Sequence, residues 1–316
     1  MKRALILGIG GQDGSYLADI LLERGYTVHG LHRHSSVDNL HRIRSIKSKL
    51  LLHRGDITDH NATSSLIREI HPSEIYNVAD QDSVPWSFSL PTRTFDVTTT
   101  AVANILETIC QFDLSIKVFQ PVSAVMFGDA PFPQTEDTPI NPLSPYGVAK
   151  AATYHLCRYY RQVHDVQVWT GILYNHDSPR RSPGYLLQEL AYQAVQVARG
   201  REKRIRVGDP HMIVDIGFAR DYMEGAVDML KSPLPHDAIL ASGSARDIHS
   251  IVLEALHIVN SDAGIVQDTS LLRPGPKVTL VGDNMRALWN FRFKPKTSFT
   301  ELLRSIIDKL WEQYHD

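Results

Sequence analysis

Three features are scarce in this 316-residue chain: cysteine, long apolar runs and an excess of charge of one sign. Only Cys110 and Cys157 occur, both in apolar helical contexts, which excludes a disulfide framework and a cysteine-rich zinc site. No apolar run approaches the roughly 18 residues of a membrane span, and the apolar start ends at Gln12 without a signal-cleavage pattern. The 33 basic and 35 acidic side chains nearly cancel. We therefore expect a cytoplasmic protein whose partners include neither nucleic acid nor a membrane.

What is present is an alternation of short apolar runs with helical patterns, typical of parallel β-α-β units. The predicted strands are Ala4–Leu7, Thr27–Leu31, Leu51–His53, Ile75–Val78, Val118–Pro121 and Val166–Leu173. The predicted helices are Ser15–Arg24, Ala62–Ile70, Ala101–Gln111, Pro145–His164, Leu186–Arg199 and Phe299–Tyr314. We predict an α/β protein with a doubly wound parallel sheet over residues 1–174, completed by later segments. Residues 175–316 are expected to form a smaller α+β region that binds the substrate.

A glycine-rich turn stands between the first predicted strand and helix, at Gly8, Gly11 and Gly14. Glycines there permit a tight turn and let the backbone approach a pyrophosphate at the helix N-terminus. The turn, including Gln12 and Asp13, is therefore a candidate dinucleotide site. A purely structural turn is the alternative.

The end of the second predicted strand indicates which dinucleotide is bound. It carries Arg33, Ser35 and Ser36 where an NAD-selective fold usually has a carboxylate. Arginine pairs in bidentate fashion with a 2′-phosphate, so we expect NADP, with NAD still possible; a solvated basic turn is the alternative. Asp56 and Ile57, after the third strand, are expected to contact the adenine. A surface cap is the alternative for Asp56.

Tyr146 and Lys150 lie four residues apart at the start of a predicted helix, on one face of it. A free tyrosine has a pKa near 10, too high for a base at neutral pH, and a nearby ammonium and the positively charged nicotinamide favour the phenolate. Tyr146 is thus a candidate catalytic group for a substrate hydroxyl, with Lys150 expected also to hold the nicotinamide ribose and Ser123 as the partner hydroxyl. Two exposed helix residues are the alternative interpretation.

With these features the chain resembles the extended short-chain dehydrogenase/reductases, and among them the GDP-mannose 4,6-dehydratases. The segments that carry the resemblance are Gly11–Ala18, Arg33 with the loop 35–43, Glu74–Asn77, Ser144–Tyr146 and Gly171–Arg181. The resemblance implies a Rossmann domain, bound NADP, a nucleotide-sugar substrate and chemistry that begins by oxidation at C4. It also implies a homodimer or homotetramer, in which the loop 35–43 reaches the neighbouring subunit.

The chain departs from this family at a catalytic position. Where the dehydratases carry a glutamate that handles the C5 proton, this chain has Val125. Losing that carboxylate is expected to remove elimination and leave hydride transfer at C4 possible. Asp80 and Asp82 stand where the family has alanine and serine. Asp82 is a conceivable replacement carboxylate, and a solvated or helix-capping aspartate is its alternative.

The predicted substrate-binding residues lie mainly in the second half. Arginine suits a nucleotide diphosphate through bidentate pairing, and one arginine that the family has there is replaced by Val214. The candidates are Asp82, Ser123, Asn175, Arg180, Arg181, Arg206 and Arg273, with a GDP-linked sugar favoured. The 15 histidines form no recognised ligand spacing with cysteine or carboxylate, so no metal site is expected.

Three functions remain open from the sequence. The first is an NADP-dependent enzyme acting at C4 of a nucleotide sugar by dehydrogenation, reduction or epimerisation. The second is a 4,6-dehydratase with a substitute carboxylate. The third, an inactive cofactor-binding regulatory protein, is disfavoured because a scaffold does not need Tyr146 and Lys150.

Overall fold

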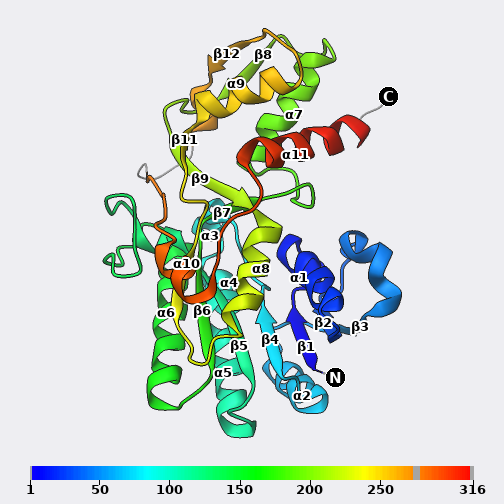
Figure 1. Ribbon diagram of the computed structural model, residues 1–316, viewed down its shortest axis with the longest axis vertical. Coiled ribbons are helices and arrows are strands. Elements are labelled where there is room, and N and C mark those ends of the chain that lie inside the picture. The colour runs from blue at the N-terminus through cyan, green and yellow to red at the C-terminus, as the bar shows by residue number, and fades with distance from the viewer. Residues whose placement is uncertain (1, 273–277, 314–316) are drawn as a thin grey trace.

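A computed structural model describes residues 2–272 and 278–313 (Figure 1). Its larger sheet has seven parallel strands in the order β10-β6-β5-β4-β1-β2-β3. The strands are β1 (Arg3–Leu7), β2 (Thr27–His32), β3 (Leu51–Arg54), β4 (Glu74–Asn77), β5 (Lys117–Ser123), β6 (Val168–Leu173) and β10 (Asp237–Leu240). The predicted fold class, an α/β protein with a doubly wound parallel sheet, is confirmed.

Helices cover both faces of this sheet, and β1, β4, β5, β6 and β10 are buried along nearly their whole length. Successive side chains of β1 alternate: Ala4 and Ile6 join one core cluster, and Leu5 and Leu7 join the other. The first face is covered by α1 (Gln12–Glu23), α8 (Ala219–Met229) and α10 (Met285–Phe291); the second by α2 (His60–Ile70), α5 (Ala101–Phe112) and α6 (Pro145–Val163).

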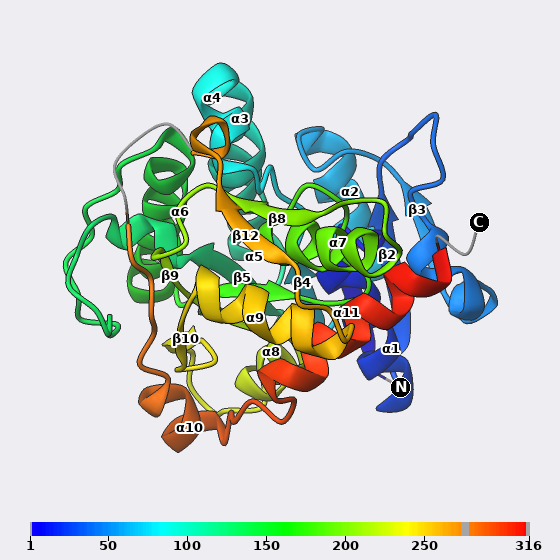
Figure 2. The ribbon, with the colours of Figure 1, turned by 90° about the horizontal axis from the view of Figure 1, so that it is seen from above.

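A smaller unit lies above the sheet in the view of Figure 1 and has a core of its own. Its helices α7, α9 and α11 are seen from above in Figure 2. Its elements are α7 (Leu186–Ala198), α9 (Ile248–Ile258), α11 (Phe299–Gln313), the three-stranded sheet of β11 (Ala245–Asp247), β9 (Ile213–Phe218) and β7 (Asn175–Asp177), and the pair β12 (Gly264–Gln267) and β8 (Arg204–Val207).

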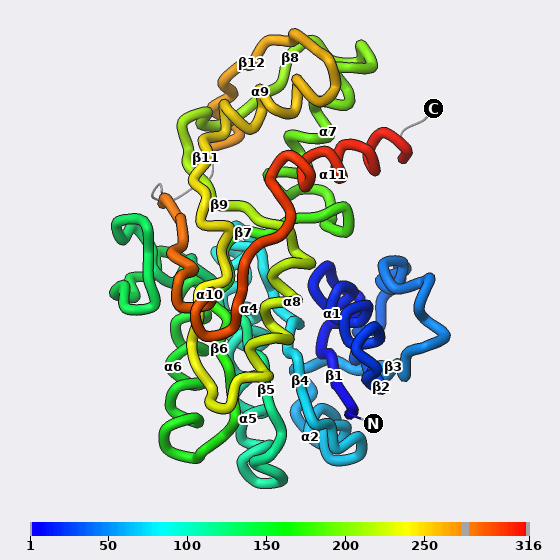
Figure 3. The backbone as a smooth tube through the Cα atoms, in the orientation of Figure 1, coloured from blue at the N-terminus to red at the C-terminus, as the bar shows by residue number. Residues whose placement is uncertain are grey.

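The chain passes between the two units more than once, as the tube in Figure 3 shows. After β9 it returns to the larger unit as α8 and β10, and it returns again as α10 before ending in α11. The first 174 residues therefore do not contain the whole parallel sheet.

The segment 84–100 was not anticipated from the sequence. It folds as α3 (Val84–Ser89), α4 (Pro91–Phe95) and a π-helical turn at 96–100 that runs into α5. Ser83 caps α3 by accepting a hydrogen bond from the Trp86 backbone nitrogen. A 3₁₀ helix at 41–49 was missed as well, because its residues lack a helical apolar pattern.

The sheet order reverses direction between β1 and β4, which are neighbours. In doubly wound sheets ligands bind at the carboxyl ends of the strands beside such a reversal. Here those ends face the smaller unit (Figure 1). The segments after β1, β4 and β5 therefore meet at one place.

Candidate active site

The glycine-rich turn joins β1 to α1, and its backbone path requires two of its glycines. Gly8 has a φ of +88°, and a Cβ there would lie 2.8 Å from the Ala79 backbone nitrogen. A Cβ at Gly14 would lie 2.3 Å from the carbonyl oxygen of Gly8. The exposed Gly11 is the N-cap of α1, and no side chain among the described residues caps the helix. The first N–H groups of α1 therefore suit an anion.

The side chains of Gln12 and Asp13 turn away from this anion position and fasten α1 to the segment after β6. Gln12 Oε1 accepts a hydrogen bond from Ser178 Oγ at 2.8 Å, and Asp13 Oδ2 lies 3.0 Å from His176 Nε2. Burial alone would raise the pKa of Asp13, but His176 lowers it to about 2. Only the backbone of these two residues is thus left for a cofactor phosphate.

Three polar residues follow β2 at the surface, as the sequence argument requires for a 2′-phosphate. Arg33, Ser35 and Ser36 are all exposed. The Asn39 amide holds the loop by donating to the Arg33 carbonyl oxygen at 2.9 Å, and Ser35 Oγ accepts from the Val37 backbone nitrogen at 3.2 Å. This arrangement leaves a flexible guanidinium and two hydroxyl groups facing solvent at the cofactor end of the sheet.

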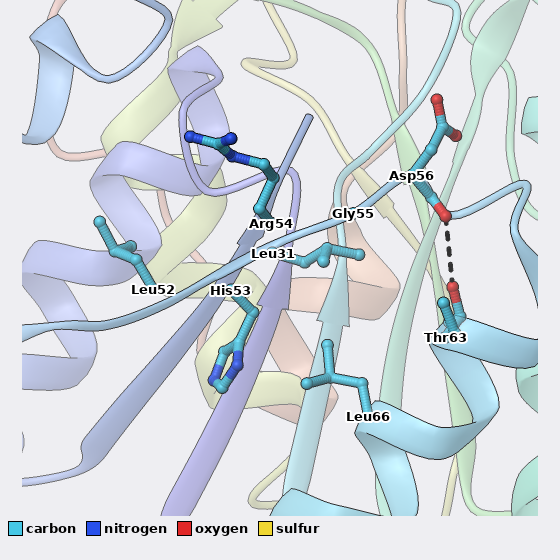
Figure 4. Close-up of a pocket in the computed structure, with 9 residues that line it drawn as sticks. Leu31, Leu52, His53, Arg54, Gly55, Asp56, Thr63 and Leu66 are labelled. Carbon is cyan, nitrogen blue, oxygen red and sulfur yellow. Dashed lines mark hydrogen bonds between the residues drawn. The ribbon is translucent and has the colours of Figure 1, made fainter. Parts of the chain in front are cut away.

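A cavity of about 340 Å³ opens between the ends of β2 and β3 and the start of α2 (Figure 4). Leu31 and Leu66 form part of its wall, and Thr63 donates to the carbonyl oxygen of Asp56. The Asp56 carboxylate itself accepts from the Thr58 backbone nitrogen and lies 3.2 Å from Arg93. These partners outweigh burial and lower its pKa.

The adenine contact predicted for Asp56 stays a prediction, since both carboxylate oxygens have protein partners. The neighbouring Ile57 is buried and belongs to the core under the cavity. An apolar wall beside a few polar groups is the usual lining of a site for a flat heteroaromatic base.

The three predicted catalytic residues come together at the carboxyl end of β5. Ser144 caps α6 by accepting from the Gly147 backbone nitrogen, which sets the first turn of α6 over the end of β5. Tyr146 and Lys150 are 7% and 4% exposed, so the alternative of two exposed helix residues is wrong. Ser123, the last residue of β5, hydrogen-bonds the phenol of Tyr146.

A fourth residue, Asp80, joins this cluster from the loop after β4. Its Oδ2 lies 2.6 Å from Lys150 Nζ and accepts a hydrogen bond from Tyr146 Oη at 3.4 Å. Its Oδ1 accepts from Thr98 Oγ1 at 2.5 Å and from the Gln81 backbone nitrogen at 2.8 Å. Asp80 is therefore held in place by hydrogen bonds to both oxygens. It was not predicted as a site residue.

The sequence argument expected Lys150, together with the positively charged nicotinamide, to favour the phenolate of Tyr146. The protein groups act in the opposite direction: the pKa of Tyr146 is raised well above its usual range, first by burial and then by the negative charges of Asp80 and Asp82. The Ser123 hydroxyl and Arg181 lower this pKa without outweighing them. The Lys150 ammonium is paired with Asp80 at 2.6 Å.

Asp82, the predicted substitute carboxylate, lies farther out and is exposed. It accepts hydrogen bonds from Arg181 at 3.1 Å and from Tyr185 Oη at 2.9 and 3.0 Å. The Arg181 guanidinium also stacks 3.5 Å from the centre of the Tyr185 ring. Asp82 and Arg181 thus bridge the larger unit and the segment 178–185.

The other predicted substrate residues are dispersed. Arg180 lies 2.6 Å from Asp19 and 4.2 Å above the Tyr16 ring, which fastens it to α1. Asn175 is exposed on β7, and Arg206 is exposed on β8, 3.8 Å from Asp268 in the smaller unit. The last candidate, Arg273, lies outside the described residues.

Val125 lies in the short 3₁₀ helix at 124–127, directly after Ser123 and Ala124. It packs, partly buried, against the larger core and cannot move a proton. The carboxylates with the largest electrostatic effect on Tyr146 are those of Asp80 and Asp82, and both have protein partners.

Among the described residues, no group of three or more histidine, cysteine, aspartate or glutamate side chains is arranged to hold a metal ion. None of the helices in the described part of the chain combines the length and the apolarity that a membrane crossing requires.

Comparison with known proteins gives a family. The family model described as GDP-mannose 4,6 dehydratase matches residues 5–306. GDP-mannose 4,6 dehydratase 1 of Arabidopsis thaliana is 34% identical over 98% of this chain and 89% of its own. The GDP-mannose 4,6 dehydratase of Homo sapiens is 33% identical over 96% of this chain and 90% of its own.

Solved structures share the fold at lower identity. A UDP-glucose 4-epimerase of Thermotoga maritima, solved with UDP-glucose, superimposes with a TM-score of 0.88 at 21% identity, covering 98% of this chain and 99% of that one. RMD from Pseudomonas aeruginosa, complexed with NADPH, gives 0.83 at 21% identity, covering 99% and 100%.

Proposed function

Since the chain belongs to the GDP-mannose 4,6-dehydratase family of NAD(P)-dependent nucleotide-sugar enzymes, we propose that it transfers a hydride between NADP and C4 of a GDP-linked hexose without eliminating water. One observation carries the proposal: Ser123, Tyr146 and Lys150 are assembled at the carboxyl end of β5, whereas residue 125 beside them is a valine. Tyr146 would supply the proton transfer, and the valine at position 125 offers no carboxylate for an elimination.

The residues at the glycine-rich turn fit a dinucleotide. The N-cap glycine of α1 is exposed, and a Cβ built at Gly11 would meet only the Gly8 carbonyl oxygen, at 3.3 Å. The N-terminus of α1 would hold the diphosphate, and Arg33, Ser35 and Ser36 would hold the 2′-phosphate that distinguishes NADP. The bound cofactor supplies or accepts the hydride.

The chain's own residues handle the proton. Tyr146 Oη donates a proton to, or accepts one from, the sugar oxygen at C4. Ser123, which already bonds the phenol, orients that oxygen, and Lys150 is fixed by the Pro121 carbonyl oxygen at 3.2 Å and by Asp80. Arg181, beside the site, is the described arginine placed to meet a nucleotide diphosphate.

The dehydratase alternative requires a free carboxylate near Tyr146. Elimination needs one group to remove the C5 proton and an acid to help water leave from C6. Asp80 is bound to Lys150 and Thr98, and Asp82 is bound to Arg181 and Tyr185. Either residue would have to give up these partners first, so the structure favours hydride transfer alone.

The products of the purified protein test this proposal. The protein is incubated with GDP-mannose and NADP, and separately with a GDP-linked 4-keto-6-deoxyhexose and NADPH, and the nucleotide sugars are identified by mass spectrometry and NMR. We expect a change of two hydrogens, or an unchanged mass with inverted C4 if the protein epimerises. A product that has lost one water contradicts the proposal.

Replacing the proton-transfer group tests its mechanism. Tyr146→Phe is expected to lower turnover by at least about a hundredfold, the usual contribution of a general acid or base. Tyr159→Phe is the matched control, because Tyr159 lies on the same helix but is 49% exposed. If Tyr146→Phe turns over like Tyr159→Phe, the assignment of Tyr146 is wrong.

A further inference from the structure

One carboxylate oxygen connects the ammonium and the phenol of the proposed catalytic pair. Oδ2 of Asp80 lies 2.6 Å from Lys150 Nζ and accepts from Tyr146 Oη. The side chains of Asp80 and Lys150 are 15% and 5% exposed, so water screens their charges weakly. The aspartate is also held through its other oxygen by Thr98 and the Gln81 backbone nitrogen. The carboxylate is thus a fixed charge in the site.

A tyrosine next to a lysine alone would experience an uncompensated positive charge, which favours the phenolate. In this chain burial comes first in raising the pKa of Tyr146, and the negative charge of Asp80 comes next. Tyr146 Oη also lies 3.4 Å from Asp80 Oδ2, a long hydrogen bond in which the phenol is the donor. Burial and Asp80 therefore favour a phenol here.

We propose that Asp80 is a positioning residue that keeps Tyr146 protonated, so that at neutral pH the site is ready to donate a proton to a nucleotide-linked 4-keto sugar. This inference rests on the proposed function and specifies the protonation state of Tyr146. The remaining charges that face Tyr146 do not replace Asp80. Asp82 acts in the same direction but is bound to Arg181, whose positive charge opposes it.

In the reductive direction Tyr146 transfers its phenolic proton to the carbonyl oxygen as C4 gains a hydride, whose source is a reduced pyridine nucleotide. The C4 carbonyl becomes a secondary alcohol by a two-electron reduction, and the phenolate then regains a proton from water. A phenol that stays protonated over the whole neutral range is competent for this step in nearly every molecule. The reverse step needs the phenolate, which is scarce there.

The ionisation of Tyr146 is measurable without cofactor or substrate. The apoprotein is labelled with ¹³Cζ-tyrosine, and the resonance of Tyr146 is assigned by its loss in Tyr146→Phe. In the unmodified protein the resonance is expected to stay that of a phenol well above the pH at which exposed tyrosines titrate. Titration of Tyr146 at or below that pH overturns the proposal. This measurement uses the unmodified protein, so it does not depend on whether a variant of Asp80 folds.

Asp80→Asn keeps the shape of the side chain and removes its charge. The titration of Tyr146 is expected to move down by at least about one pH unit, which raises the phenolate fraction about tenfold at a given pH. With cofactor added, the pH profiles of both directions should move down by about the same amount, so that the rise of alcohol oxidation and the alkaline decline of ketone reduction both begin at lower pH. A purely structural role of Asp80 would produce loss in both directions.

Asp82→Asn is the matched carboxylate control. It is expected to shift the titration of Tyr146 less than Asp80→Asn does, because only Asp80→Asn removes a hydrogen-bond acceptor of Tyr146. An equal shift in both variants, or none in Asp80→Asn, contradicts the role of Asp80. The proposed function fails separately, through undiminished turnover by Tyr146→Phe. The titration of the apoprotein still reports on Asp80 in that case.

Discussion

Two partly buried aspartates pair with cations at the carboxyl end of the sheet, and their roles differ. Asp80 pairs with Lys150 beside the phenol of Tyr146, and Asp13 pairs with His176 between α1 and β7. The histidine pair contains an imidazole, whose ordinary pKa lies near neutrality. The first pair therefore sets the electrostatics of the proposed reaction, and the second fastens the two units in a pH-dependent way.

The hydrogen bonds of His176 explain why its pair with Asp13 depends on pH. Its Nδ1 faces the Tyr174 carbonyl oxygen at 2.8 Å and its Nε2 faces Asp13, an arrangement with an acceptor at each nitrogen that favours the imidazolium. Burial lowers the pKa of His176, but Asp13 raises it above its ordinary value. At Asp80 the cation is an ammonium, and the pKa of the neighbouring phenol is raised.

Breaking the lysine pair is expected to have the largest effect. Lys150→Met leaves the Asp80 carboxylate buried without its cation, which costs about 3–5 kcal/mol of unfolding free energy. Turnover should be lost as well. Denaturant titration measures the stability, with Lys49→Met as an exposed control. The double variant Lys150→Met with Asp80→Asn should regain part of the loss; an equally unstable double variant would show that charge is not the cause.

Breaking the histidine pair is expected to cost about 2 kcal/mol, and only within a pH window. The pKa of His176 is raised, so its contribution is present below the ordinary value of 6.5 and is lost as pH rises through the higher folded value. The pKa of Asp13 is lowered, so its contribution is present above 3.8 and is lost as pH falls through about 2. The contribution of this pair to the unfolding free energy should therefore be greatest between pH 3.8 and 6.5.

His176→Gln tests this window, since glutamine keeps a donor without a titrating charge. Unfolding free energy is measured across the pH range in the variant and the unmodified protein. The difference should be largest in weakly acidic solution and should shrink as pH rises past the folded pKa of His176. A difference that does not vary with pH would mean that the pair is held by packing.

The sequence predicted the strands and long helices of the larger unit closely, because each is an apolar run with turn residues at its ends. It also placed Tyr146, Lys150 and Ser123 together, because a helix spacing and the end of a parallel strand fix where such residues lie. These features follow from local sequence patterns. The return of β10 to the larger sheet does not follow from a local pattern.

The contacts of Asp80 were not predictable in the same way. They join Asp80 after β4, Thr98 in the π-helical turn and a pair of residues on α6, and nothing in the local sequence shows which of two neighbouring aspartates points inward. The position of both aspartates directly after β4 was a usable signal that they lie near the site, because the end of β4 lies beside that of β5 in the sheet. The alternation of side chains along an extended segment does not separate the two aspartates, because residues two apart lie on the same side.

Replacing Arg33, which follows β2, is expected to have a smaller effect. The side chain is exposed, so its removal leaves no buried counter-ion without a partner. Arg33→Ala is expected to weaken NADP binding about tenfold by removing one charge-assisted hydrogen bond, with little change for NAD. Dissociation constants for both cofactors measure this, and Arg204→Ala in the smaller unit is the exposed control. Equal weakening of both cofactors would mean that Arg33 does not meet the 2′-phosphate.

The smallest effect is expected at Asp82, and it separates the two candidate reactions. The Asp82 side chain is 49% exposed, so its pair with Arg181 contributes less than about 1 kcal/mol. Asp82→Asn should therefore unfold like the unmodified protein and keep ketone reduction within about tenfold, since its carboxylate moves no proton in that reaction. A dehydratase that used Asp82 would lose at least about a hundredfold of its elimination in the same variant. Because stability is nearly unchanged, a loss of that size would identify Asp82 as the substitute carboxylate and reverse the roles assigned to the two aspartates.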